Sequence, residues 1–593
     1  MLLSTITSPK DVKALDAGAL PQLCAEIRQA ILQSSSVVGG HVGSNLGVVE
    51  LTVALHRVFD APEDKLIFDV SHQTYAHKML TGRAACYLDS ARFDELSGFA
   101  SPAESEYDLF AMGHTSTSVS LACGMVRARD LAGEHHKVVA VIGDGSLSGG
   151  LAYEGLNALA EMGSDVLVIV NDNGWSIAEN HGGIYRNLAA LRRTGGTAEN
   201  NLFRAIGFDY RFLAEGNDVF KVEEALRALH DIEGPTVLHL CTTKGQGYGP
   251  ALADAESWHH VGSFDLARGT LTVPANRHAN APETYAELTG AHLMERIAKD
   301  PSVVVVSAAT PYIMGFTPER RAAAGAQYID AGIAEEHATT LSAGLARGGA
   351  KPVLGLYGVF MQRAFDQFWH DICLNNLPVT ILDFGSSVHG ANDATHLGFY
   401  DLALMGALPR LTCLAPTCRE EYLAMLDWAI DQTDHPVAIR VPGDAVVSRP
   451  ALAPERGARF DTPSYQIVRE GTQVAILALG SFFGLGERVA DELERACGIA
   501  PTLINPRHVT QFDTAALAQV AARHACVVTL EDGVLEGGWG EKIARLLGGC
   551  DVHVLAYGLR KGFPDRFDAK ELLAQSGITV EGIVADVLED LGR

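Results

Sequence analysis

The sequence lacks the features that mark secreted and membrane-spanning proteins. Its ten cysteines include no CxxC pair, and scattered cysteines are typical of reduced cytosolic thiols rather than of disulfides or metal ligands. No run of about 18 apolar residues occurs, so we expect no transmembrane helix. The first residues carry neither a basic segment nor an apolar core with a small-residue cleavage site, so we expect a cytoplasmic protein.

Basic residues are scarce relative to acidic ones. The chain has 46 Lys and Arg residues against 72 Asp and Glu residues, which gives a formal net charge of −26. A strongly acidic surface repels nucleic acids and anionic lipids, so we expect neither as a partner. An anionic substrate therefore needs a local basic pocket that offsets the negative electrostatic potential of the surface.

What the sequence does contain is a series of short apolar runs separated by segments of helical period. A length of 593 residues corresponds to three or four domains of about 150 residues. The alternation predicts an α/β protein with three doubly wound parallel-sheet domains. The strand-like runs lie at 137–145, 165–173, 235–243, 302–310, 351–360, 378–385, 473–481 and 526–533.

Two segments without periodicity interrupt this alternation. Residues 271–284 and 440–464 are rich in proline and other turn-forming residues, which is typical of linkers. They predict three domains, at residues 1–275, 285–445 and 465–593.

Polar side chains follow two of the predicted strands. Asp144 lies in a Gly-Asp-Gly after one strand, and Asn173 ends an Asn-Asp-Asn after the next, 29 positions later. This is the length of a strand–helix–strand unit, so we expect both at the carboxyl edge of a parallel sheet. Together with the backbone carbonyl of Trp175 they supply three oxygen ligands for Mg²⁺, which also prefers phosphate oxygens. A lone Gly-Asp-Gly often marks only a turn.

The pair of motifs at this spacing resembles the thiamine diphosphate motif of transketolases, pyruvate decarboxylases and related dehydrogenases. The resemblance implies thiamine diphosphate and Mg²⁺ as cofactors. Such a cofactor needs a buried carboxyl with a raised pKa that shares a proton with its pyrimidine ring. The segment AGIAEEHA (331–338) resembles the Ala-Glu-Gln-His of these enzymes. This implies Glu335 for that role, with Glu336 as the alternative because Gln is usual there.

Six further motifs are spread along the chain: HVGSNLG (41–47), DVSHQTYAHK (69–78), GHTSTS (113–118), YGVFMQRAFDQ (357–367), THLG (395–398) and AIRVP (438–442). Together they resemble the 1-deoxy-D-xylulose-5-phosphate synthase family over about residues 1–590. The resemblance implies decarboxylation of pyruvate and transfer of the two-carbon unit to glyceraldehyde 3-phosphate. It also implies a homodimer with small-molecule substrates, and a cofactor held between the first two domains of one chain.

The resemblance assigns roles residue by residue. For the cofactor it implies His72, Gly113, His114, Ser116, Gly145, Ser146, Asn173, Lys244, Glu335 and Phe360. For the metal it implies Asp144, Asn173 and Trp175. For catalysis it implies Glu335 and the histidines His41, His72, His259 and His396. For substrates it implies Tyr357, Arg363, Asn392, His396 and Arg440. A structural role is the alternative for any one of these histidines taken alone.

The match departs from the family on the acceptor side. Phe384 stands where the family has an Arg, so Arg440 lacks its expected partner in binding the acceptor's phosphate. Asn392 stands where the family has an Asp, although Asp393 is adjacent. His389 is an addition, and either a surface role or an altered acceptor contact fits it. These changes keep open a specialised paralogue with the same donor chemistry and a different aldehyde or ketone acceptor.

A second departure follows the metal motif, where typical members carry a long insertion and residues 180–210 here are short. Arg186, Arg192 and Arg193 in this segment are either a solvated helix face or a phosphate-facing lid. Ser71 and Glu336 replace the usual Gly and Gln. A non-catalytic thiamine-fold subunit is disfavoured because the metal ligands and the activating Glu are present. A lipoamide-linked dehydrogenase component is disfavoured because no lipoyl module is recognisable.

Overall fold

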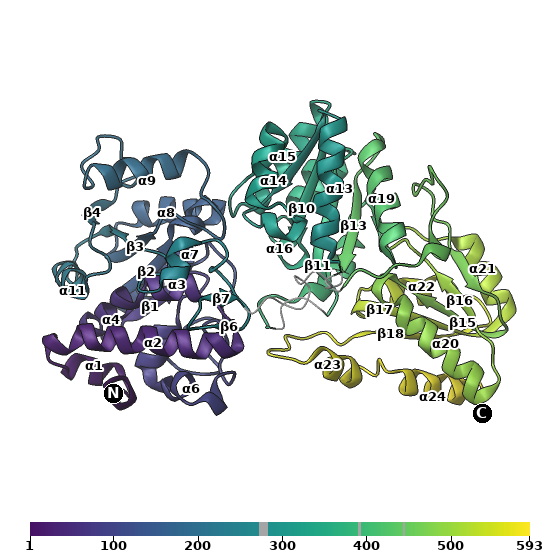
Figure 1. The fold of residues 1–593 in the computed structure, drawn as a ribbon, viewed down its shortest axis with the longest axis horizontal. Coiled ribbons are helices and arrows are strands. Elements are labelled where there is room, and N and C mark those ends of the chain that lie inside the picture. The colour runs from purple at the N-terminus through teal and green to yellow at the C-terminus, as the bar shows by residue number, and fades with distance from the viewer. Residues whose placement is uncertain (272–282, 389–392, 443–444) are drawn as a thin grey trace. The chain divides into compact units, whose positions relative to one another are not determined.

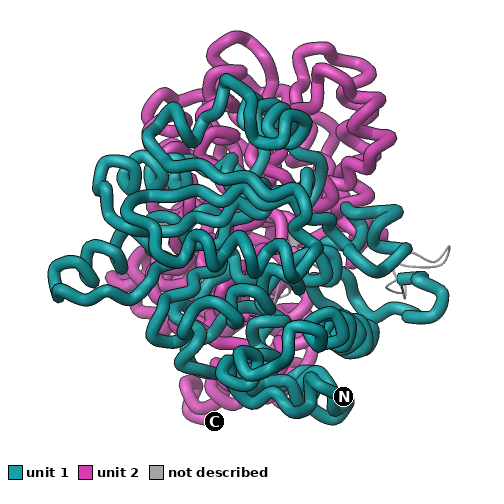
Figure 2. The backbone as a smooth tube through the Cα atoms, turned by 90° about the vertical axis from the view of Figure 1, so that its left-hand side faces the viewer, with its two compact units in different colours: residues 1–281, 332–334 teal, residues 282–331, 335–593 magenta. Residues whose placement is uncertain are grey.

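Three sheets of mainly parallel strands, each flanked by helices, make up the fold (Figure 1). The computed structural model describes residues 1–271, 283–388, 393–442 and 445–593. Its chain divides into two compact units (Figure 2), which comprise residues 1–281 with 332–334 and residues 282–331 with 335–593.

The first unit is built on a five-stranded parallel sheet with the order β1-β2-β3-β5-β4. Its strands are β1 (Lys65–Phe68), β2 (Val138–Gly143), β3 (Val166–Asp172), β4 (Asp209–Leu213) and β5 (Pro235–Cys241). A short antiparallel ribbon follows, formed by β6 (Phe264–Asp265) and β7 (Thr270–Leu271). Its helices are α1 (Pro9–Ala14), α2 (Leu20–Val38), α3 (Val42–Gly47), α4 (Val49–Val58), α5 (Tyr75–Lys78), α6 (Ala85–Leu88), α7 (Ser118–Ala132), α8 (Gly150–Met162), α9 (Gly183–Arg193), α10 (Leu202–Ala205), α11 (Val219–Ala228) and α12 (Gly249–Ala253).

Alternate residues of the interior strand β2 enter two different apolar cores. Ala140 and Ile142 belong to a cluster with residues of α7, α8 and α9, whereas Val139 and Val141 belong to one with residues of α4 and α11. Successive side chains of a strand point to opposite faces, so helices cover both faces of this sheet, as predicted. Burying each Val or Ile side chain of this strand stabilises the fold by about 1.5–3 kcal/mol. This two-sided burial explains the uninterrupted apolar runs.

The second unit contains two sheets. The first has six parallel strands in the order β12-β13-β11-β10-β8-β9, and the second has five in the order β14-β16-β15-β17-β18. The strands are β8 (Val303–Ser307), β9 (Tyr328–Asp330), β10 (Lys351–Tyr357), β11 (Thr380–Ser386), β12 (Thr412–Leu414), β13 (Val437–Pro442), β14 (Gln466–Arg469), β15 (Gln473–Ala478), β16 (Thr502–Asn505), β17 (His524–Val534) and β18 (His553–Leu559). The helices are α13 (Tyr285–Lys299), α14 (Pro318–Ala324), α15 (Glu335–Arg347), α16 (Gly358–Met361), α17 (Phe365–Gln367), α18 (Asp401–Met405), α19 (Arg419–Asp431), α20 (Phe483–Cys497), α21 (Thr514–Arg523), α22 (Trp539–Leu547), α23 (Ala569–Gln575) and α24 (Val580–Asp590).

These two sheets share an apolar core. One buried cluster joins Leu354 of β10 and Ile381 of β11 to Leu477 of β15 and Trp539 of α22. In these two sheets, as far as the structure describes them, the strand pairing departs from a parallel pattern at one edge, where β14 pairs antiparallel with β16. The predicted domain boundaries stay predictions, because the first falls largely outside the described residues and the second lies within one compact unit.

No helix in the described ranges is both long and apolar enough to span a membrane. All ten cysteines carry free thiols.

Candidate active site

The two predicted metal ligands follow neighbouring parallel strands. β2 ends at Gly143, which lies opposite Asn171 of β3. Asp144 therefore begins at the carboxyl edge of the sheet, next to the loop that carries Asn173. The backbone N–H of Gly174 in that loop donates to Asp144 Oδ2 at 3.0 Å. The predicted placement of these two residues is confirmed.

The surroundings of Asp144 fit a divalent cation. Its Oδ2 also accepts from Asn180 Nδ2 at 2.8 Å, while its buried Oδ1 has no hydrogen-bond partner in the described part of the chain. Burial, together with the nearby carboxylate of Asp172, raises the pKa of Asp144 to about 8. A hard cation such as Mg²⁺ would bind the orphaned oxygen and offset both effects. The amide oxygen of Asn173 accepts from the Trp175 N–H at 3.0 Å and keeps a second lone pair.

The loop around Ser116 lies against the Gly-Asp-Gly turn. Ser116 has a positive φ of 73°, and its N–H donates to Asp69 Oδ2 at 2.8 Å. Its hydroxyl donates to the backbone carbonyl of Ser146 at 2.8 Å. A side chain on Gly145 would place a Cβ 2.7 Å from the Cβ of Ser176, so only glycine fits there. These contacts bring three of the predicted diphosphate-binding residues together.

Lys244 comes to the same place from the loop after β5. Its Nζ donates to the carbonyl of Ser176 at 2.7 Å and lies 5.9 Å from the ring centre of Trp175. Burial lowers the pKa of Lys244 to about 8. Gly113, which is buried, and His114, which is half-buried, lie on the loop that leads to Ser116 and α7.

Three of the predicted catalytic histidines lie together in the first unit. The ring centroid of His41 is 5.0 Å from that of His72 and 5.6 Å from that of His259, and the last two are 5.3 Å apart. Sequence reasoning missed His260, whose ring is 4.6 Å from His41, and Phe99, whose ring is 5.5 Å away. The adjacency of His260 to His259 was the only available signal. Burial lowers the pKa of His259 well below its ordinary value, so this imidazole is neutral at about pH 7.

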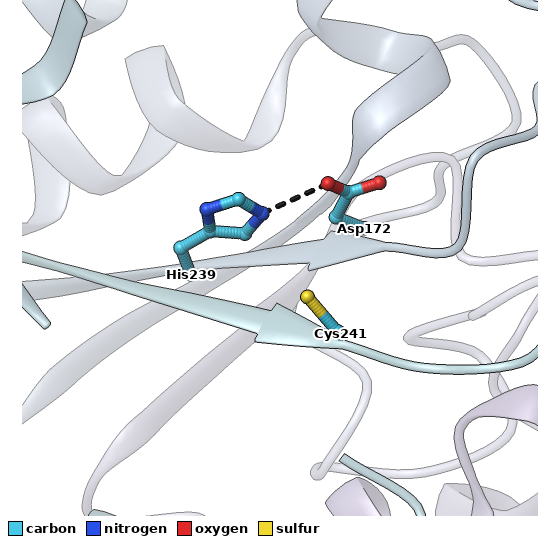
Figure 3. A group of neighbouring side chains, drawn as sticks. All are labelled: Asp172, His239 and Cys241. Atoms are coloured by element: carbon cyan, nitrogen blue, oxygen red, sulfur yellow. Dashed lines mark hydrogen bonds and ion pairs between the residues drawn. The ribbon is translucent and has the colours of Figure 1, made fainter. Parts of the chain in front are cut away.

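A buried network lies behind the metal loop. Figure 3 shows Asp172 at the end of β3 beside His239 and Cys241 of β5. His239 Nε2 is hydrogen-bonded to Asp172 Oδ2 at 2.8 Å, and His239 Nδ1 is hydrogen-bonded to the Tyr210 hydroxyl at 2.8 Å. Arg192 of α9 donates to the same carboxylate. The ligand atoms of Asp172, His239 and Cys241 lie within 4.8 Å of one another. Because a cationic guanidinium already neutralises Asp172, this group is better described as an ion-pair network than as a second metal site.

The second unit holds Glu335 at the start of α15. Its side chain is buried, and Arg363 Nη1 donates to Glu335 Oε2 at 3.1 Å. Burial raises the pKa of Glu335, an effect that the Arg363 charge only partly offsets. The alternative residue, Glu336, is half-buried rather than buried. The burial pattern therefore favours Glu335 as the carboxyl that retains a proton.

Aromatic side chains connect the other candidates of this unit. The ring of Phe360 is 5.6 Å from that of His396 and 5.7 Å from that of Tyr357, edge to face in both cases. The backbone N–H of Arg363 donates to the carbonyl of Phe360 at 3.2 Å. His396 Nδ1 lies 3.3 Å from Asp393 Oδ1. Five of the predicted residues, Glu335, Tyr357, Phe360, Arg363 and His396, are thus linked within the second unit.

Arg440 does not have the surroundings expected of a substrate clamp. It is 3% exposed, and its guanidinium donates to Asp401 and, at 2.6 Å, to Asp532 Oδ1. Three of its five N–H donors are therefore engaged by carboxylates, and the side chain is buried, which is typical of an internal ion pair. The sequence predicted a substrate-binding role for Arg440. No pattern in the sequence indicates that Arg440 of β13 meets Asp532 of β17 in the fold. Burial and the neighbouring Asp401 raise the pKa of Asp383 well above its ordinary value.

The remaining acceptor-side candidates are only partly described. Phe384 is buried in an apolar cluster of the six-stranded sheet. The predictions for His389 and Asn392 lie outside the described residues.

Comparisons with known proteins define first a class. A family model described as "Transketolase, pyrimidine binding domain" matches residues 252–447, and one described as "Transketolase, C-terminal domain" matches residues 464–583. Together with the three mainly parallel sheets, these matches place the chain among the transketolase-like α/β enzymes. A solved transketolase from Campylobacter jejuni aligns over 97% of this chain and 100% of its own at 17% identity, with a TM-score of 0.44, which is too distant for a functional inference.

Closer relatives define the family. A model described as "1-deoxy-D-xylulose-5-phosphate synthase" matches residues 3–199. A protein of that name from Pelotomaculum thermopropionicum is 37% identical over 99% of this chain and 97% of its own length. Another, 1-deoxy-D-xylulose-5-phosphate synthase 1 from Geobacter sulfurreducens, is 38% identical over 98% and 96%. The chain belongs to the 1-deoxy-D-xylulose-5-phosphate synthase family.

Proposed function

We propose that this protein decarboxylates pyruvate and joins the two-carbon unit to glyceraldehyde 3-phosphate, giving 1-deoxy-D-xylulose 5-phosphate and CO₂. Relatives that carry this activity in their names match it over nearly its full length. The observation that carries the proposal is the buried Oδ1 of Asp144, which has no hydrogen-bond partner among the described residues and lies at the carboxyl edge of a parallel sheet. A homodimer in the cytoplasm that acts on small molecules is proposed with it, by analogy with the family.

The first unit offers the groups that would hold Mg²⁺ and a diphosphate. Asp144, Asn173 and the carbonyl of Trp175 would bind the metal. The surrounding loops would bind the diphosphate through backbone and side-chain donors, with contributions from His72, Gly113, His114, Ser116, Gly145, Ser146 and Lys244. When bound, the thiazolium ring of thiamine diphosphate supplies the electron sink for decarboxylation.

The second unit offers a proton-holding carboxyl. A raised pKa lets Glu335 keep a proton on a carboxyl oxygen and share it with a pyrimidine nitrogen. Phe360 would pack against the pyrimidine ring. Arg363, with its planar guanidinium, and Tyr357 would orient the substrates.

The histidines would move protons around the reacting carbons. His259 is neutral at working pH and is therefore able to accept a proton, as a general base requires. His41 and His72, in ring contact with it, would complete a proton-transfer cluster. His396 would serve the same purpose in the second unit.

Product identification tests the proposal. Purified enzyme with thiamine diphosphate, Mg²⁺, labelled pyruvate and glyceraldehyde 3-phosphate should yield a labelled five-carbon phosphate by mass spectrometry, and Asp144→Asn should not. The comparisons favour this acceptor. The carboxylates around Arg440 and the buried Phe384 are the reason for adding unphosphorylated aldehydes to the panel. A coupled product from one of these, with none from glyceraldehyde 3-phosphate, would overturn the proposed acceptor in favour of a specialised paralogue.

A further inference from the structure

Helix α9 borders a cavity that contains the metal-ligand candidate Asp144. The cavity has a volume of about 320 Å³. Its wall is formed partly by the metal loops and partly by residues of α9 and the turn before it, among them Tyr185, Arg186 and Arg192. The buried Oδ1 of Asp144 and Oδ1 of Asn180, another lining residue, have no hydrogen-bond partner within the described ranges. The cavity is therefore lined by polar oxygens that are able to bind a cation or a hydrogen-bond donor.

Three contacts fix α9 against the metal loops. Leu188 and Leu191 are buried in the same apolar cluster as strands β2 and β3. The hydroxyl of Tyr185 donates to the carbonyl of Gly145 at 3.2 Å. Arg192 forms an ion pair with the fully buried carboxylate of Asp172, between the two metal-loop asparagines. The side of the helix that faces the cavity is therefore held in place.

Arg186 combines an unpaired charge, within the described part of the chain, with a place in the cavity wall. Its side chain is exposed and lines the cavity, and no carboxylate in the described part of the chain pairs with it. Arg193 is also exposed but does not line the cavity. Arg192 differs from both because Asp172 neutralises it. The three arginines of α9 thus have three different environments.

We propose that Arg186 binds the terminal phosphate of the cofactor's diphosphate, and that Arg192 is a positioning residue that holds α9 on the metal loop through Asp172. This inference rests on the proposed thiamine diphosphate cofactor. A diphosphate carries more negative charge than one Mg²⁺ neutralises. A planar guanidinium binds a phosphate through two parallel hydrogen bonds. The short segment 180–210 thereby supplies a diphosphate contact of its own.

Isothermal titration calorimetry tests the contact. The full-length protein is first stripped of bound metal, then supplied with saturating Mg²⁺ and titrated with thiamine diphosphate. Arg186→Gln should weaken thiamine diphosphate binding by about tenfold to hundredfold, the loss expected for one charge-assisted contact. Its effect on thiamine monophosphate, which lacks the terminal phosphate, should be much smaller. Arg193→Gln is the matched control on the same helix and should bind both ligands as the wild type does. Matching thermal unfolding without ligand shows that each variant is folded.

The outcomes separate the two proposals. Unchanged thiamine diphosphate affinity in Arg186→Gln, or an equal loss for both thiamine phosphates, overturns the contact while the proposed function stands. A wild-type protein that binds no thiamine diphosphate overturns the proposed function itself.

The positioning role has its own measurement. Arg192→Gln should lower the affinity for Mg²⁺ in the presence of thiamine diphosphate, and Arg192→Lys, which keeps a charge for Asp172, should restore most of it. Equal Mg²⁺ affinities in Arg192→Gln and the wild type would overturn this part of the inference.

Discussion

Replacing Arg440 with methionine leaves two buried carboxylates, Asp401 and Asp532, without their shared cation. Arg440 and Asp401 are each 3% exposed and Asp532 is 1% exposed, and the guanidinium contacts both carboxylates. Removing one partner of a buried ion pair costs about 3–5 kcal/mol, because the remaining charges lose their compensation. A loss of that size lowers the ratio of folded to unfolded protein by about two to four orders of magnitude.

The pH dependence of this loss follows from the carboxyl of Asp532. Burial alone would raise its pKa, but the Arg440 charge and hydrogen bonds hold the pKa of Asp532 below its ordinary value. A lowered pKa means that the stabilisation is present above the unfolded value of about 3.9 and is lost as pH falls through the folded value. In Arg440→Met the carboxyls are free to take up protons. The stability deficit should therefore be largest at about pH 7 and shrink toward pH 4.

Calorimetry of the full-length protein at several pH values measures this effect. It resolves separate unfolding transitions, which matters because two compact units need not unfold in one step. Arg459→Met is the control, because Arg459 pairs with Asp461 at the surface of the same unit and should leave the transition unchanged. Suppose instead that Arg440→Met unfolds like the wild type and raises KM only for a phosphorylated acceptor. Arg440 would then face the substrate, and the structural account of it would be refuted.

Two further predictions concern buried carboxyls. Glu335→Gln should lower kcat by about 10²–10⁴-fold, the usual contribution of a positioned proton-transfer group. Glu336→Gln should change kcat little. Steady-state kinetics compare the two variants, and equal losses would contradict the assignment. Asp108→Asn should destabilise the first unit by about 3–5 kcal/mol at pH 7, because Asp108 accepts from Arg83 at 2.7 Å and faces His77 at 3.2 Å. Burial acts to raise the pKa of Asp108, but these two partners hold it below the ordinary value. The deficit, measured by urea unfolding, should therefore shrink as pH falls below about 4, and a deficit independent of pH would contradict this account.

Much of the fold could be predicted because its signals are local. Each of the eight predicted apolar runs overlaps a strand, and β2 and β3 are neighbours, as the spacing of Asp144 and Asn173 requires. The eight runs leave out the edge strands β1, β4, β9, β12, β14 and β18, the ribbon strands β6 and β7, and the interior strands β13 and β16. An edge strand has one neighbour and need not be a continuous apolar run, so its residues carry little periodic signal.

The sequence by itself determined the alternating α/β architecture and the residues at the strand ends, since side-chain period and motif spacing are properties of neighbouring positions. Only the tertiary structure decided which partners those residues have. Such cases are the hydrogen bond from Asn180 to Asp144, the ring contact between His260 and His41, and the ion pair of Arg440 with Asp532. These partners meet through chain folding rather than sequence pattern, and burial then sets the charge that each group carries. For that reason Arg440 resembled a substrate ligand in the sequence and is an internal ion pair in the fold.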